Sequence, residues 1–184
     1  NALNEEWETK FTSWDEVVPL TTAEAQAKGN YAGWMDHRTF MEQVFARAVA
    51  VAAEAVKRED PEGLASLSGT QVPGPSNAVN WYLLDQVVDY LQPYSDDDQD
   101  DLHRSMRPGL LLTGFTGYER RGKVLRHELW TRLLHGHGGA SLFWHYTALN
   151  PDLTLTEQGR DLAETIGEFR NEGLALLLRG AERE

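Results

Sequence analysis

Apolar residues recur along the chain at two spacings that alternate. One set lies three or four positions apart, which is the period of a helix: Phe40, Val44, Ala48, Val51 and Ala55. A helix is therefore predicted over 34–58. Short, nearly continuous apolar runs follow, and such runs are typical of strands buried on both faces. They predict strands at 64–68, 87–91, 110–112 and 140–144, with further helices at 76–84, 96–106, 124–135 and 156–169.

The alternation of helices with short apolar strands indicates an α/β fold of about four βα units around a parallel sheet. A complete (β/α)8 barrel needs roughly 250 residues, and this chain has 184. We therefore expect half of a barrel, a single partial domain over 1–184, with an irregular segment over 1–33 and the βα units over 34–184. A small doubly wound sheet is the alternative. No Gly-x-Gly-x-x-Gly follows any predicted strand, so nucleotide binding has no support.

The net charge of the chain limits the kinds of molecule that it is expected to bind. Lysine and arginine together number 17 against 29 aspartates and glutamates, which gives a formal net charge of −12. Nucleic acids and anionic membranes attract positive surfaces, so neither is expected as a partner. No apolar run approaches the ~20 residues that a membrane helix needs. The absence of cysteine removes disulfides, thiolate chemistry and zinc sites of the cysteine type, and the sequence does not indicate a cellular location.

The residues that follow each predicted strand form the candidate site, because active sites of βα barrels lie at the carboxyl ends of the strands. Most of these residues are aromatic, amide or hydroxyl side chains, and Gln92 is among them. Those expected to bind substrate are Gln71, Tyr94, Tyr118, Trp144 and His145, and the one carboxylate is Glu119. Aromatic faces stack on sugar rings, and amides and hydroxyls pair with sugar hydroxyls. With no cluster of lysines or arginines nearby, this set suits a carbohydrate better than a phosphate.

Each candidate also has a purely structural interpretation. Trp144 ends a strand, where aromatic residues usually belong to a core, and Glu119 precedes two arginines that would suit a solvated loop. His135, His137 and His145 lie close in sequence, but their spacing matches no zinc pattern, so neither a metal nor a cofactor is predicted. The acidic run over 96–101 suits the positive end of a helix dipole.

Several stretches are similar to one enzyme family. The opening Leu3-Asn4-Glu5-Glu6-Trp7-Glu8-Thr9, followed by Trp14-Asp15-Glu16-Val17-Val18-Pro19, resembles the segment after the fourth barrel strand of glycoside hydrolase family 42, the β-galactosidase type. That family has Leu-Asn-x-x-Trp-Gly-Thr and then Trp-x-Glu-Ile-x-Pro. Further similar stretches lie at 36–40, 88–94, 128–130 and 135–144. The resemblance spans nearly the whole chain and implies the second half of a clan A (β/α)8 barrel.

The resemblance implies a retaining glycosidase with two glutamates, whose carboxyl groups lie ~5–5.5 Å apart. The acid/base follows the fourth strand, upstream of this chain, and the nucleophile sits at the tip of the seventh strand. The family pattern, counted from Pro108, puts the nucleophile at Thr113, which cannot attack as a carboxylate. Glu119 is the only carboxylate in that loop and is therefore the expected catalytic residue.

Two functions follow as hypotheses. The first is hydrolysis of a β-linked sugar by double displacement, with this chain supplying the nucleophile side. The second is a non-catalytic, carbohydrate-binding or degenerate glycosidase-like domain. A metal-dependent hydrolase that uses the histidines is a third and weaker option. An isolated half-barrel exposes the edges of its sheet, so we also expect the missing N-terminal half, another chain or self-association into a homo-oligomer to cover them.

Overall fold

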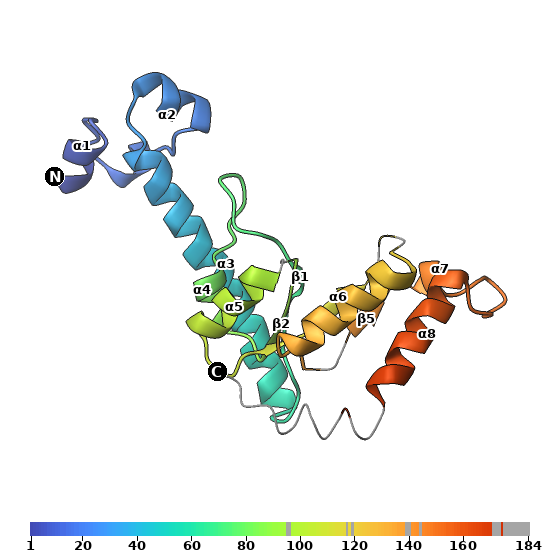
Figure 1. Cartoon of the computed structure of the whole chain (residues 1–184). Helices are drawn as coiled ribbons and strands as arrows, with labels where there is room; N and C mark the ends of the chain where they lie inside the picture. The colour runs from blue at the N-terminus through green and yellow to red at the C-terminus, as the bar shows by residue number, and fades with distance from the viewer. Residues whose placement is uncertain are drawn as a thin grey trace.

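A computed structural model describes residues 1–94, 97–116, 118, 120–138, 141–143, 145–170 and 174. The chain opens with two short helices, α1 (Ala2–Glu6) and α2 (Thr22–Lys28), with a 3-10 turn, η1 (Trp14–Glu16), between them. The long helix α3 (Ala32–Glu59) follows and leads into the strands (Figure 1). The helix predicted over 34–58 is thus confirmed, whereas the segment expected to be irregular contains α1 and α2.

Parallel strands alternate with helices along the rest of the chain. The strands are β1 (Ser68–Thr70), β2 (Tyr90–Pro93), β3 (Leu111–Leu112), β4 (Gly114–Thr116) and β5 (Ser141–Phe143). The helices are α4 (Trp81–Asp85), α5 (Asp97–Met106), α6 (Gly122–Leu134), α7 (His145–Ala148) and α8 (Glu157–Phe169). β1, β2 and β3 form one parallel sheet in that order, and β4 pairs in parallel with β5. The predicted α/β class is confirmed at this level.

One residue, Thr113, separates β3 from β4. Its amide donates to the Leu91 carbonyl at 2.9 Å, and the Gly138 amide donates to the Leu112 carbonyl at 2.7 Å. These bonds connect the three-stranded sheet of β1, β2 and β3 to the pair of β4 and β5. Each parallel strand therefore has as its neighbour the strand that precedes or follows it in sequence, with a helix in between.

The main core lies on one face of the three-stranded sheet. Ala46 and Val49 of α3 and Leu84 of α4 pack there with Leu91 and Leu112, which are almost fully buried. Side chains alternate between the two faces of a strand. The neighbours Tyr90, Gln92, Leu111 and Thr113 accordingly line a hollow on the opposite face.

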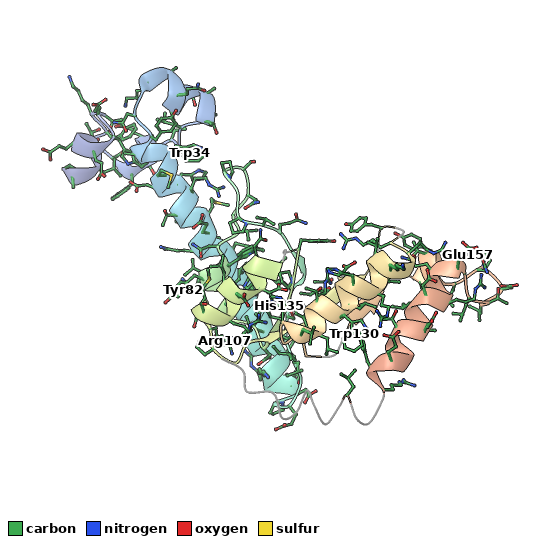
Figure 2. All side chains as sticks on the ribbon, in the orientation of Figure 1. Trp34, Tyr82, Arg107, Trp130, His135 and Glu157 are labelled. Carbon is green, nitrogen blue, oxygen red and sulfur yellow. The ribbon has the colours of Figure 1, made fainter. Side chains whose placement is uncertain are left out.

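A second, smaller core joins α6 to α8. Leu125 and Leu129 of α6 pack on Leu162 of α8. Trp130 lies between the two helices, where its Nε1 donates to Glu168 at 2.8 Å (Figure 2). The same carboxylate accepts from Arg126 Nε at 2.9 Å. These contacts hold α6 against α8.

The opening segment is held by polar contacts around one buried tryptophan. Trp7 packs so closely on Gly33 that a Cβ there would lie 2.8 Å from its ring, and its Nε1 donates to Asp36 at 2.8 Å. Asn4 closes the turn over 9–11 through bonds to Thr9 and Phe11, each 2.8 or 2.9 Å long. The tryptophan-rich opening is thus anchored to the first turns of α3.

Candidate functional site

The ends of the strands bring two predicted site residues together. Tyr94 follows β2 and Tyr118 follows β4, and their side chains are hydrogen-bonded to each other. The bond with Tyr118, helped by partial burial, raises the pKa of the Tyr94 phenol above its usual value of 10.0. The carboxyl ends of β2 and β4 therefore present a pair of phenol groups.

The Tyr94 ring is seated on a glycine of β1. A Cβ on Gly69 would lie 2.7 Å from Tyr94 Cε2, and Gly69 has a positive φ of 65°, so a larger residue has neither the space nor the backbone conformation. Strand pairing is irregular between Ser68 and Thr70. The Tyr94 amide donates to the Thr70 carbonyl at 2.9 Å. Gln71, the next residue, therefore lies beside the tyrosine pair at the same edge.

The loop that carries Gln71 is held over the helices. The Gln71 carbonyl accepts from Trp81 Nε1 at 3.0 Å. Farther along the loop, the Gly74 carbonyl accepts from Arg38 Nη2 at 2.8 Å. Asn80, which caps α4, donates its side-chain amide to Glu42 at 2.9 Å. The Gln71 side chain itself is exposed and is free to meet a ligand from solvent.

Of the other candidates, His145 is the one that the structure describes. His145 begins α7, is exposed, and packs edge-on against Tyr146 within the same helix, with ring centroids 5.8 Å apart. Glu119 and Trp144 lie outside the described residues. The structure thus joins Tyr94 and Tyr118, sets Gln71 beside them, and leaves the other three predictions untested.

A hollow of about 310 Å³ opens on the face of the sheet that the main core leaves uncovered. It is lined by Leu64, Leu67, Ser68, Tyr90, Gln92, Leu111 and Thr113. A chain of polar contacts crosses three strands at this hollow: Ser68 Oγ donates to Gln92 Oε1, and Gln92 Nε2 donates to the Gly114 carbonyl, each at 3.2 Å. Ser68 and Thr113 were not among the predicted site residues. Side chains alternate between the two faces of a strand, and Leu91 and Leu112 are buried on the core face. Their neighbours Gln92 and Thr113 could therefore have been assigned to the opposite face from the sequence.

Among the residues that the structure describes, none that lines the hollow carries a charged side chain. The arginines that follow β4 are already paired: Arg120 with Glu128 at 2.6 Å, and Arg121 with Glu157 at 2.6 Å and Asp161 at 2.9 Å. Anionic ligands such as phosphates need unpaired cations or helix ends to receive them. The arrangement suits a neutral ligand with hydroxyl groups and an apolar face.

Comparisons with known protein families, with curated proteins and with solved structures find no match to this chain. Across the described residues, no group of three or more histidine or acidic side chains is placed to hold a metal ion. In the same part of the chain, no helix has the length and apolar character needed to cross a membrane.

Proposed function

We propose that this chain is the second half of a glycosidase-type (β/α)8 barrel that binds a β-linked sugar at the carboxyl ends of its strands and takes part in its hydrolysis. The observation that carries the proposal is the Tyr94–Tyr118 pair, which stands beside Gln71 at one sheet edge. Phenol and amide groups around an uncharged hollow provide stacking surfaces and hydrogen bonds for a neutral sugar.

The backbone at Glu8 supports the resemblance to glycoside hydrolase family 42. Glu8 has a φ of 53°, a left-handed conformation that L-residues other than glycine rarely adopt. The family stretch Leu-Asn-x-x-Trp-Gly-Thr has glycine at this position. A glycine at this position would adopt the same conformation without strain, so the observed turn is compatible with the family pattern although the chain carries a different residue there.

In the proposed reaction, Glu119 supplies the nucleophile. Its carboxylate attacks the anomeric carbon, the glycosidic bond breaks, and the leaving oxygen takes a proton from the acid/base of the first half of the barrel. Water, deprotonated by the same acid/base, then hydrolyses the glycosyl–enzyme ester and returns the carboxylate. The Tyr94–Tyr118 pair and Gln71 hold the sugar in place at the strand ends during both steps.

Replacing Glu119 tests the catalytic part. In protein that contains both halves of the barrel, Glu119→Gln should abolish hydrolysis of an aryl β-galactoside while binding of methyl β-galactoside persists. Glu62→Gln, at an exposed turn after α3, is the matched control and should leave turnover unchanged. Unchanged turnover in Glu119→Gln removes this residue from the mechanism.

A second candidate function, sugar binding without turnover, is favoured by one specific observation. Thr113 stands at the strand tip where the family pattern places its nucleophile, and its hydroxyl donates to the Leu91 carbonyl at 3.4 Å. None of the described residues that line the hollow is a carboxylate. Isothermal titration with galactosides beside a turnover assay separates the two functions, because heat of binding without product supports the second.

A further inference from the structure

Gln92 is a buried amide that belongs to none of the hydrophobic clusters. Only 2% of its surface is exposed, yet it lines the hollow on the open face of the sheet. Its two ends are held by neighbouring strands: Ser68 of β1 donates to its oxygen, and its nitrogen donates to the carbonyl of Gly114 in β4. Because one contact is a donor and the other an acceptor, they fix which end of the amide is oxygen and which is nitrogen.

The amide retains hydrogen-bonding capacity beyond these two contacts. A glutamine side chain has two N–H donors and two acceptor lone pairs on its oxygen. Ser68 and Gly114 use one of each, which leaves one donor and one acceptor. A buried polar group of this kind is stabilised when a ligand or water completes its bonds.

The surroundings of Gln92 fit a sugar ring. Tyr90 and Leu111 give the hollow an aromatic and an aliphatic wall, and the Thr113 hydroxyl, whose proton is directed at the Leu91 carbonyl, keeps its oxygen able to accept. One donor and one acceptor on a fixed amide match two adjacent hydroxyl groups, one accepting and one donating. Within the described part of the chain, the lining has no charged group to favour an ionic ligand.

We propose that Gln92 is a specificity-determining residue that binds two adjacent hydroxyl groups of a neutral sugar ring seated in this hollow. This inference rests on the proposed function, since it places the ring below the Tyr94–Tyr118 pair. Gln92 then selects sugars by the positions of their hydroxyl groups, while the tyrosines and Gln71 contact the ring from the edge.

The test combines a protein variant with modified sugars. Affinities of methyl β-galactoside and its 2-, 3-, 4- and 6-deoxy forms are measured by titration for the wild-type protein and for Gln92→Met, which has a similar volume and no amide. For the wild type, removing one hydroxyl that Gln92 binds should weaken affinity by about three- to tenfold. Gln92→Met should bind the parent sugar more weakly by a similar factor and should not distinguish it from that deoxy sugar.

Gln86→Met is the matched control, because Gln86 is exposed and donates only to the Met106 carbonyl at 3.4 Å. It should keep the wild-type preference among the sugars. If Gln92→Met weakens all five sugars equally, Gln92 is only structural and the inference is wrong. If the wild type binds no galactoside, the proposed function itself fails. If Gln92→Met does not fold, the wild-type protein is titrated with methyl β-galactoside and followed by NMR. The side-chain amide resonances of Gln92 should shift while those of Gln86 do not. The reverse result overturns the inference.

Discussion

Glu8 holds the least favourable backbone conformation of the opening segment. Its φ of 53° brings Cβ against the following carbonyl, which costs an L-residue about 1–2 kcal/mol. Glu8→Gly should therefore raise the free energy of unfolding by about 1 kcal/mol, measured by urea denaturation. Glu5→Gly, inside α1, serves as the opposite control and should lower it by up to about 1 kcal/mol. A loss of stability in Glu8→Gly would contradict the left-handed turn.

Asp89 gives the molecule a pH-sensitive contact between α3 and the strands. Its carboxylate accepts from the Ala65 amide at 2.8 Å and pairs with Lys57 at 3.0 Å, and these contacts, the amide first, lower the pKa of Asp89 below 3.8. The stabilisation is thus present above the pKa of the unfolded state and is lost as the pH falls through the lowered folded pKa. We expect Asp89→Asn to flatten the fall in unfolding free energy between about pH 5 and about pH 2. An equally steep fall in Asp89→Asn would refute this assignment.

At the scale of single residues, the positions that follow the predicted strands indicated part of the candidate site. Tyr94 and Tyr118 were found because residues that follow parallel strands gather at one edge. Ser68 was missed because the pairing between Ser68 and Thr70 is irregular, which no apolar pattern reports. Thr113 was missed because the apolar run of the predicted strand ends at Leu112, although alternation from Leu112 indicates it. Tyr118, one partner of the phenol pair, has a left-handed backbone with a φ of 56°, which the sequence does not reveal either.

The main helices and strands were predicted in the right order, with the first two strands displaced, whereas β4 and α7 were not predicted. The runs at 64–68 and 87–91 predicted strands that begin instead at Ser68 and Tyr90. Apolar residues ahead of each strand pack into the core as part of the approach to it: the Ala65 carbonyl accepts from the Asp89 amide, and Ser66 donates to the Tyr90 carbonyl, without a regular ladder. A run of apolar residues therefore indicates which positions are buried, but only backbone pairing decides where a strand begins.

The contact between α4 and α5 depends on a buried pair. Asp85 and His103 are both fully buried, with Nδ1 and Oδ2 2.9 Å apart, and the His103 ring centroid lies 4.5 Å from that of Trp81. Asp85→Ala leaves a buried histidine without its partner and should cost about 3 kcal/mol of unfolding free energy. Asp101→Ala, on the exposed side of α5, should cost less than about 1 kcal/mol. Urea denaturation followed by tryptophan fluorescence measures both, and similar costs would contradict the role of the pair.

At the scale of the whole molecule, one side of the sheet and of α3 has no neighbour among the described residues. β1 pairs with β2 only, and α3 meets the core through Ala46 and Val49. The periodic stripe that predicted α3 lies away from that core, with Phe40 and Val51 each 60% exposed. A helix with apolar residues on both faces is typical of a position between two neighbours. This is the geometry that the half-barrel proposal requires at its seam.

The open side leads to a prediction about association. Exposed apolar stripes and free strand edges are covered by whatever chain is available, so these 184 residues, produced alone, should self-associate. The double variant Phe40→Glu with Val51→Glu places two charges in the stripe and should shift sedimentation velocity profiles toward the monomer. Val124→Glu, on α6 at 64% exposure and outside the stripe, should leave the profile unchanged. Supplying the first half of the barrel should suppress association of the wild type as the double variant does. A wild-type chain that sediments as a monomer and melts cooperatively would show that the stripe needs no cover, and the half-barrel proposal would lose its support.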